Sequence, residues 1–360
     1  MEYKLNFQDV IKRLKLLYEQ RVQDKIFAVM DIPNVTLNNF KKIHKNGYCD
    51  CPDSYDRVEF WDNLLKEKVN VEDDSIPSAY FSEFDQGLYG GLLGGNVQFM
   101  CNSDTGWISS MVPPLLNSWS EFDKLSLDFT DNKWYKYYIN ELEIFIEAAK
   151  GEFGISHFCL VDSLNFVFEL FGATQTYIEM LENPDKVRRA IEFAFKLNTK
   201  IHDIFFEKVG LFEGGTCSNF AQWIPGRIVS ESVDPFHMTN VDYFNEWGRE
   251  PVERILNYYD GGCIHIHGNG RHLLSEVSSL KGLKAILLGD DRGYPLAFDI
   301  KKDLKKQVGE IPLIITTSYN KFVEAFNKHE LIGGVLYGVN DVPDADIANK
   351  YMEKVRCYRV

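Results

Sequence analysis

Short apolar runs alternate with longer amphipathic stretches from about residue 77 onward. This alternation is typical of β/α units, in which helices cover a parallel sheet. Seven visible strands with helices between them indicate a (β/α)8 barrel with one strand missed, or a doubly wound open sheet. The runs that predict strands are residues 79–84, 155–161, 209–214, 263–267, 283–288, 313–316 and 334–337.

Two amphipathic stretches carry clear helix signals. Asn183 and Pro184 favour a helix start, and apolar side chains then recur at helical spacing over residues 187–204. Residues 135–150 form a second predicted helix, which Gly151 would end as a C-terminal cap. Both apolar stripes indicate packing against a core and no special chemistry.

The first 76 residues follow a different pattern. Residues 10–17 predict an amphipathic helix, whereas residues 46–53 form a loop-rich passage with aspartate and aromatic residues. No Ser/Gly-rich linker separates this part from the rest, and no sequence period repeats. One α/β domain over residues 77–360, with a mostly helical N-terminal extension over residues 1–76 packed on it, is therefore more economical than two domains.

Composition and charge narrow the class of protein. A chain of 360 residues with 45% hydrophobic content can bury a large core. Its formal charge of -14 means that a nucleic acid or an anionic membrane would bind against the net field, so neither is an expected partner. The chain opens without an apolar signal segment and lacks the roughly 18–20 consecutive apolar residues that span a bilayer, which predicts a cytoplasmic protein. Its seven scattered cysteines indicate reduced thiols.

The segment 263–273 carries the most informative chemistry. Its apolar run is broken by His265 and His267 and then closes on glycine, asparagine and arginine. Alternate side chains of an extended chain share a face, so both imidazoles are predicted to point the same way. Together they could bind one metal, one anion or one substrate; the alternative is a hydrogen-bonded core histidine beside a loop-edge histidine. Asn269 and Arg271 are candidate substrate-binding residues, the arginine for an anion.

Five further positions are candidates, each with a structural alternative. Asp162 ends a predicted strand and could be a general acid or base, or could cap the following helix. Glu213 is a catalytic carboxylate candidate before paired glycines, or part of an ordinary βα turn. Trp223 and Arg227 frame a predicted loop in which the arginine could bind a substrate carboxylate or form a surface ion pair. Asp290 directly follows a strand and could ligate a metal or be a solvated turn residue.

Three passages resemble the uroporphyrinogen decarboxylase superfamily, which includes methyltransferases that move methyl groups between corrinoid proteins and thiols. Residues 162–184 are similar to the family's strand-end aspartate, helix and Leu-x-x-x-Pro-Glu region, and residues 230–244 to its Asp, Ser-Pro, Phe segment. The run His265-Ile-His-Gly-Asn269 lies where the methyltransferase branch has His-x-Cys-Gly-Asn. The following Arg-His-Leu favours a related, less characterised branch. The resemblance covers about three quarters of the chain and implies a distorted (β/α)8 TIM barrel with its site at the carboxyl ends of the strands.

Departures from the family pattern bear on the expected reaction. Uroporphyrinogen decarboxylases open with an arginine-rich loop that binds propionate groups, but residues 27–33 contain no arginine. The zinc methyltransferases use one histidine and two cysteines, whereas here His267 occupies the first cysteine position and residues 337–341 lack the second. Bound zinc or another divalent metal would therefore need nitrogen and oxygen ligands. The expected set is His265, His267 and a carboxylate, with Asp290 the first choice over Glu213 and Asp341.

Three functions follow as expectations, all with a small-molecule substrate or ligand. The leading one is methyl transfer linked to a corrinoid protein or a methylated small molecule, with a metal that polarises the acceptor and Asp162 as proton acceptor. The second is metal-independent decarboxylation of a carboxylated small molecule, in which Asp162 or His265 stabilises an intermediate and supplies the proton. The third is a small-molecule-binding barrel without catalysis. The fold alone does not choose among them, because this architecture supports unrelated chemistries.

Overall fold

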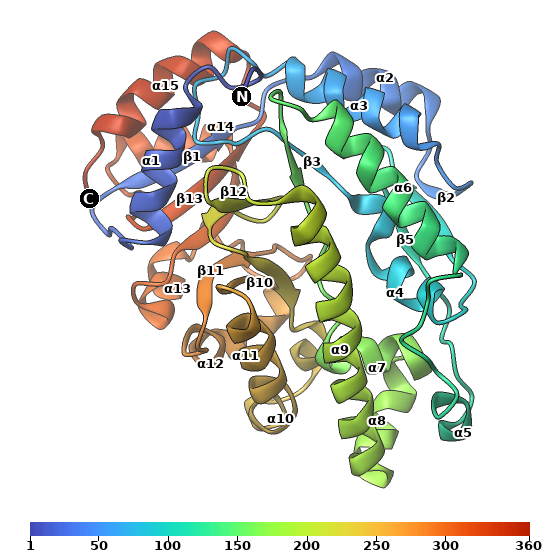
Figure 1. Cartoon of the computed structure of the whole chain (residues 1–360). Helices are drawn as coiled ribbons and strands as arrows, with labels where there is room; N and C mark the ends of the chain where they lie inside the picture. Colours follow the sequence, from blue (N-terminus) through green and yellow to red (C-terminus); the bar gives the residue numbers. More distant parts are fainter.

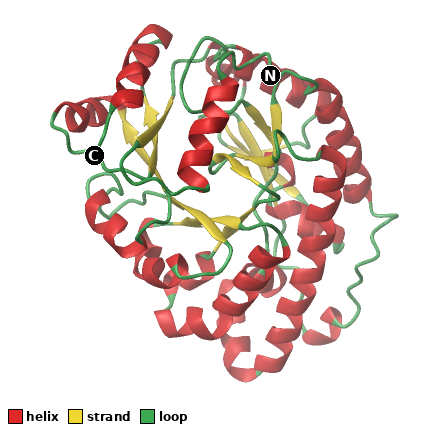
Figure 2. Ribbon diagram, turned by 60° about the vertical axis from the view of Figure 1, so that its left-hand side comes forward, coloured by secondary structure: helices red, strands yellow, loops and turns green.

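The computed structural model describes residues 1–360, and its central feature is a six-stranded parallel sheet. Helices lie outside the strands, which surround a central space in a barrel-like arrangement (Figures 1 and 2). The apolar runs that predicted strands at 283–288 and 313–316 lie in this sheet. Its strands, in spatial order, are β1 (Ile26–Met30), β13 (Val335–Asn340), β12 (Leu313–Ser318), β11 (Leu283–Leu288), β10 (Gly262–Ile266) and β9 (Val229–Ser232).

Two more parallel strands, β3 (Ser78–Tyr80) and β6 (Gly154–Ser156), pair with each other and form a separate two-stranded sheet. The chain after β6 is joined to β9 by the bond from Leu160 N to Ser230 O, 2.8 Å long. Between β3 and β1, however, no strand pairing is present. The structure is therefore an α/β fold with barrel-like order, and a closed eight-stranded barrel stays a prediction.

Several predicted strand limits differ from the observed ones. The strand predicted at 79–84 stops at Tyr80 because Ser82–Phe84 form a 3-10 helix, and the one predicted at 155–161 is regular only to Ser156. The strand predicted at 209–214 is wrong. Gly210 and Gly214, both with positive φ, end the preceding helix and turn the chain, so that β7 begins only at Gly215.

The remaining strands form two small antiparallel units. One contains β2 (Gly47–Cys49), β4 (Gln98–Asn102) and β5 (Trp107–Met111); the other is the hairpin of β7 (Gly215–Ser218) and β8 (Gln222–Pro225). β1 lies in the part of the chain predicted as an N-terminal extension, but it pairs with β13 over five residues. Residues 1–76 therefore supply a strand of the central sheet as well as covering helices, because Ile26–Met30 are almost wholly buried and parallel to β13.

Both helices predicted from amphipathic stripes are present. The longer one begins at Pro184, but Asn183 does not cap it, because its amide donates to Glu179 instead. The other ends at Ala148, shortly before Gly151 adopts a positive φ. The helices are α1 (Phe7–Tyr18), α2 (Val35–Ile43), α3 (Ser54–Lys66), α4 (Gln86–Leu92), α5 (Trp119–Phe122), α6 (Lys133–Ala148), α7 (Ser163–Phe171), α8 (Ala173–Glu182), α9 (Pro184–Val209), α10 (Val241–Tyr243), α11 (Arg249–Tyr258), α12 (Leu274–Ser278), α13 (Lys301–Val308), α14 (Tyr319–Asn327) and α15 (Ala345–Cys357).

Two apolar clusters hold the fold together. The larger fills the space between the strands and the outer helices. The smaller contains one residue from each of five neighbouring strands, packed against α1 and the β7–β8 hairpin at the amino ends of the strands. Its strand residues are Phe27, Leu336, Ile314, Ala285 and Cys263. Because this end is filled by side chains, the carboxyl ends of the same strands are left to form a site.

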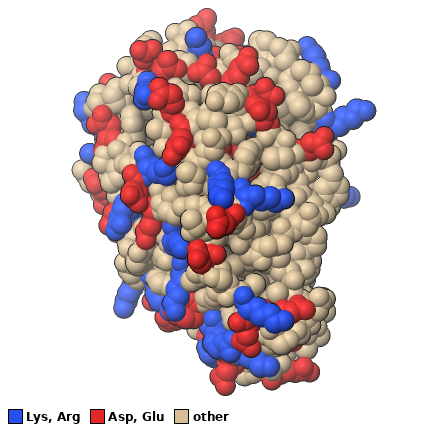
Figure 3. Space-filling model, turned by 45° about the vertical axis from the view of Figure 1, so that its right-hand side comes forward, with Lys and Arg blue, Asp and Glu red and all other residues tan.

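Charged side chains of both signs are interspersed over the face seen in Figure 3, with uncharged surface between them. The excess of acidic residues is thus not gathered into one acidic area on that face. None of the helices combines the length and the hydropathy that crossing a membrane requires.

Candidate functional site

Strand β10 places its two histidines side by side at the carboxyl ends of the strands. His265 lies opposite Ser232 of β9 and Leu287 of β11 in the parallel ladders. The rings of His265 and His267 are 4.4 Å apart between centroids. The prediction that both imidazoles share one face of an extended segment is confirmed.

Hydrogen bonding fixes the orientation of His267. Its Nδ1 lies 3.0 Å from Oδ1 of Asp291, and because a carboxylate only accepts, the imidazole nitrogen is the donor. The other ring nitrogen, Nε2, is 4.0 Å from Oδ1 of Asp234. Burial alone would raise the pKa of Asp291, but the bonds from His267 and from the backbone of Asn269 outweigh it and lower that pKa. Asp291 is therefore a stable anionic partner for His267.

A third histidine completes this cluster. His237 lies on the 3-10 helix Asp234–Met238, and its Nδ1 is 3.4 Å from Oδ1 of Asp234. Burial lowers the pKa of His237 to about 4, despite the opposing effect of Asp234. Its Nε2 is buried without a partner, as is Oδ1 of Asp234. A Cβ at Gly270 would collide with the His237 ring, so glycine is required where the loop after β10 passes it.

His265 lies within β10, whereas His267 directly follows the strand. Burial lowers the pKa of His265, and neighbouring His267 lowers it further. The strand end of β11 passes close to the ring, because a Cβ at Gly289 would lie 2.7 Å from Nε2 of His265. On its other side the ring of Phe220, from the tip of the β7–β8 hairpin, is 5.7 Å away between centroids.

A cavity of about 280 Å³ adjoins the histidine cluster. It shares Ser232 and Asp234 with the carboxyl end of β9, and no lysine or arginine lines it. Burial raises the pKa of Asp85 to about 7, and burial together with Asp85 raises that of Glu169 to about 8. The cavity thus offers two carboxyl groups that can hold or release a proton near neutral pH, together with the thiol of Cys159.

The predicted metal set of His265, His267 and Asp290 is not assembled. Asp290 accepts from Nη2 of Arg271 at 2.8 Å and from the backbone of Ala297 at 2.7 Å. Nowhere in the chain do three histidine, cysteine, aspartate or glutamate side chains converge closely enough to hold a metal ion together. The residues present therefore do not fit the predicted three-ligand centre.

Arg271 and Asn269 lie in the loop beside the cluster, with different surroundings. The guanidinium of Arg271 binds Asp290 and the backbone oxygens of Gly289 and Pro295. Arg271 thus connects the loops that follow β10 and β11. Because both of its terminal nitrogens already donate to the loop after β11, the guanidinium is not free to bind a substrate anion in bidentate fashion. Asn269 carries a buried side-chain oxygen without a partner beside Asp291, so it stays a candidate for ligand contact.

Asp162 is fully buried but lies away from the histidines. It occupies the N-cap position of α7 without making a side-chain cap bond, and neither carboxyl oxygen has a partner. Burial raises the pKa of Asp162 to about 7; Glu231, itself buried, is its close neighbour. Glu231 alternates with Ser230 and Ser232 along β9, so this carboxyl pair lies on the helix-facing side of the strand.

Three other predicted site residues lie toward the amino ends of the strands. Trp223 is fully buried in the smaller apolar cluster, where its Nε1 donates to Phe212 O at 2.7 Å. Arg227 precedes β9 and pairs with Asp260 at 3.8 Å. Glu213 is exposed in the turn before β7, with positive φ. The structure does not bring these residues to the histidine cluster, because each precedes or fills a strand instead of following one.

Sequence reasoning missed several residues of the site. Asp291 was not predicted, and Asp234 and His237 were covered only by the passage 230–244 of the family resemblance. A usable signal existed for Asp234, which follows the short strand β9 by two residues. Asp85 and Glu169 gave none, because only the folded chain brings the start of α4, where Asp85 lies, and α7 to one cavity.

No protein-family model matches the chain, and no curated protein sequence matches it either. Among solved structures, the chain is similar to a methyltransferase from Methanosarcina mazei, with a TM-score of 0.61 and 12% sequence identity. The match covers 96% of this chain and 97% of that one. At this identity it shows the fold alone: the whole chain has a methyltransferase-like fold. Membership of the uroporphyrinogen decarboxylase superfamily stays a prediction.

Proposed function

We propose that this protein is a methyltransferase whose reacting groups lie at the carboxyl ends of β9 and β10. The observation that carries the proposal is the Asp291–His267 pair, in which Asp291 holds one imidazole nitrogen and leaves the other facing Asp234. This arrangement is suited to a general base. The fold shared with a methyltransferase over almost the whole chain supports the same class of reaction.

In the proposed reaction, His267 takes the proton of an N–H, O–H or S–H acceptor. The acceptor's electron pair forms the new bond to the methyl carbon, and the bond between that carbon and the donor breaks with its electrons remaining on the donor. The proton rests on Nε2 of His267, where Asp291 and Asp234 stabilise the imidazolium. Neutral His265 lies beside it and can accept or donate a hydrogen bond to the acceptor.

The methyl donor is proposed to be a corrinoid carried by a partner protein or a methylated small molecule. Because the predicted metal ligands do not converge, the proposed reaction rests on the side chains of the chain alone. Asp162 is not part of it, since its carboxyl group faces the covering helices.

The test is a methyl-transfer assay with the whole purified chain and methylcobalamin as donor. One thiol, one amine and one hydroxyl compound serve as acceptors, and the cobalamin absorbance reports loss of the methyl group. We expect turnover with one acceptor, and a decrease of about 10²–10⁴-fold in kcat for His267→Gln, because that variant cannot take the proton. The matched control is His44→Ala, which removes an exposed histidine at the end of α2.

Two results would contradict the proposal. Folded protein that transfers no methyl group from methylcobalamin to any of the three acceptors would argue against methyl transfer. Equal rates for wild type and His267→Gln would remove His267 from the reaction.

Decarboxylation is the second candidate, favoured by the two carboxyl groups with raised pKa values in the cavity. Asp85 and Glu169, with pKa values of about 7 and 8, can supply the proton that replaces CO₂ on carbon. They take the place of Asp162, which does not line the cavity. Release of CO₂ from a panel of small carboxylic acids, lost in a Glu169→Gln variant, would support it. The absence of a lysine or arginine from the lining makes it the weaker candidate, because nothing cationic there receives a carboxylate.

A further inference from the structure

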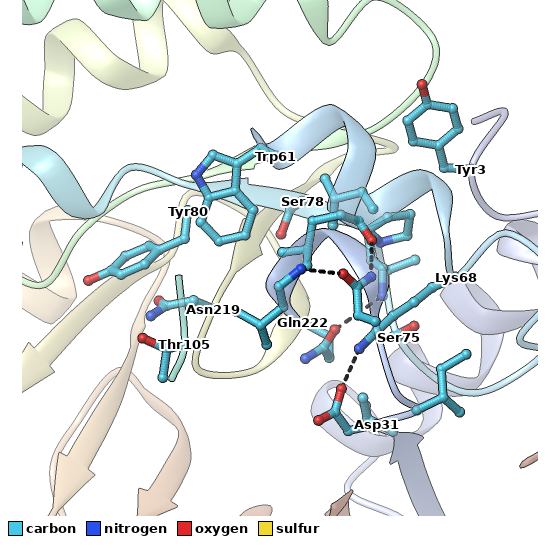
Figure 4. A pocket seen from close by; sticks show the side chains of 18 of the residues that line it. Tyr3, Asp31, Trp61, Lys68, Ser75, Ser78, Tyr80, Thr105, Asn219 and Gln222 are labelled. Carbon is cyan, nitrogen blue, oxygen red and sulfur yellow. Dashed lines mark hydrogen bonds and ion pairs between the residues drawn. The ribbon is translucent and has the colours of Figure 1, made fainter. Parts of the chain in front are cut away.

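A second and larger cavity, of about 400 Å³, lies between the ends of β1 and β3 (Figure 4). Its lining comes from the segment before α1, the end of β1, helices α2 and α3, β3 with the segment before it, the β4–β5 hairpin and the tip of the β7–β8 hairpin. None of its lining residues belongs to the cavity beside the histidines. The volume is within the range of small-molecule sites.

The cavity exists because β1 and β3 do not pair with each other. The free edge of β1 is instead satisfied by two carboxylates: Met30 N donates to Asp73 at 2.7 Å, and Ala28 N donates to Asp74 at 2.9 Å. Side chains thus replace a neighbouring strand at this edge. The opening between β1 and β3 is therefore part of the stable fold, because the backbone N–H groups along it have hydrogen-bond acceptors even without a ligand.

Charges on the lining are neutralised in pairs. Lys4 is buried and binds Asp73 at 2.5 Å, and Lys68 binds Asp31 at 2.6 Å. Asp104 faces Lys41 at 3.5 Å. With no unpaired lysine or arginine and no unpaired carboxylate, the cavity does not favour an ionic ligand.

Besides these paired charges, the lining of the cavity contains aromatic rings and polar atoms without hydrogen-bond partners, which a ligand could contact. Trp61, Tyr80 and Trp107 all line the cavity, with Tyr80 and Trp107 packed edge to face at 4.9 Å. Figure 4 shows the side chains of Trp61 and Tyr80 above Asn219 and Thr105. Nε1 of Trp61, a donor, and Oδ1 of Asn219, an acceptor, are buried without partners. Each such atom costs free energy unless something binds it.

We propose that this cavity binds an uncharged, planar nitrogen heterocycle such as the base of a nucleoside. A ring of this class has a flat face for the tryptophan and tyrosine rings. Its edge carries both an N–H donor for Asn219 and an acceptor for the Trp61 N–H. The paired charges favour the neutral nucleoside over its phosphate ester.

This site is distinct from the histidine cluster and does not rest on the methyl-transfer proposal. Asn219 lines the cavity, while the next residue, Phe220, packs against His265. The hairpin tip therefore separates the two sites. Binding here can be measured without any turnover.

The test is isothermal titration calorimetry of the whole chain with adenosine, inosine and uridine, with glucose and AMP as comparison ligands. We expect saturable binding of at least one nucleoside, and weaker binding of AMP. An Asn219→Leu variant should bind at least about tenfold more weakly, because it keeps the branched shape of the side chain and removes the acceptor. Trp107→Ala should also weaken binding, since it removes one ring face, whereas Arg227→Ala, near the amino end of β9, should bind as wild type does.

Three outcomes would overturn the proposal. One is the absence of heat from all three nucleosides at millimolar concentration with folded protein. Another is binding that Asn219→Leu leaves unchanged, which would place the ligand elsewhere. The third is binding of glucose in place of the nucleosides, which would assign the aromatic rings to a sugar.

Discussion

The two ends of the central strands differ in how their polar groups are satisfied. At the amino ends, α1 and the β7–β8 hairpin fill the interior, and Trp223 and Tyr18 both donate to backbone oxygens. At the carboxyl ends, His237 and Asp234 keep buried polar atoms without partners. Strand β10 shows the contrast within a few residues, since Cys263 lies in the apolar cluster and His265, two residues later, lies in the site.

This difference indicates that one end of the sheet stabilises the fold and that the other end forms the candidate site. Stability is concentrated where apolar side chains interlock and the polar atoms of Trp223 and Tyr18 have partners. The other end leaves polar groups unpaired, which costs free energy in the absence of a ligand and is typical of functional sites. Substitutions at the two ends should therefore act differently on stability and on binding or turnover.

The largest loss of stability is expected at the amino end. Trp223→Ala should lower the free energy of unfolding by about 3–5 kcal/mol, because it leaves a cavity and removes the bond to Phe212. Urea denaturation followed by circular dichroism measures the change. The control is Trp107→Ala, whose side chain is 37% exposed and should cost much less. Similar losses for both variants would show that the amino end is not the more tightly packed one.

A pH-dependent effect is expected from Asp162, on the helix-facing side of the sheet. Its folded pKa is raised to about 7 by burial, so the folded chain holds a proton that the unfolded chain releases near the ordinary value of 3.8. Wild-type stability should therefore fall as the pH rises from about 4 to about 7 and then level off, by a few kcal/mol in total. Asp162→Asn should lack this fall.

Urea midpoints at pH 5 and pH 8 test this expectation. The variant should gain stability relative to wild type as the pH rises, whatever constant cost the buried amide adds. A difference between the two proteins that does not change with pH would mean that Asp162 is ionised in the folded chain. Glu231→Gln offers a matched comparison, since burial and Asp162 both raise the pKa of Glu231.

Local pattern predicted much of the sheet and little of the site. The apolar run of β11 was predicted at its observed limits, 283–288, whereas β9, with the sequence Val-Ser-Glu-Ser, was missed because its inward serines and buried Glu231 give no apolar pattern. His265 and His267 were found because their spacing alone puts them on one face. Asp290 and Arg271 were both named as site residues, yet they bind each other, a partnership that only the folded loops define.

A moderate effect is expected from Arg271, which joins the loops after β10 and β11. Arg271→Gln should cost about 1–3 kcal/mol of stability, because it leaves Asp290 and two backbone oxygens without their donor. Arg227→Ala, with its guanidinium 3.8 Å from Asp260 and partly exposed, should change stability by less than about 0.5 kcal/mol. If Arg271→Gln instead kept full stability and lost substrate affinity, the anion-binding role predicted from the sequence would be restored.

Only a small effect on stability is expected at His267, where the effect on turnover is expected to be large. Replacing it with glutamine removes one bond to Asp291, but it also relieves the crowding of His265 and His237 by a third imidazole. The net change in the free energy of unfolding should be within about 1 kcal/mol of zero. A loss as large as that of Trp223→Ala would mean that the carboxyl end is held together by its polar cluster. Near-neutral stability together with the loss of methyl transfer would instead show that the unpaired polar groups at this end are retained for a reacting molecule, because they contribute little to the fold.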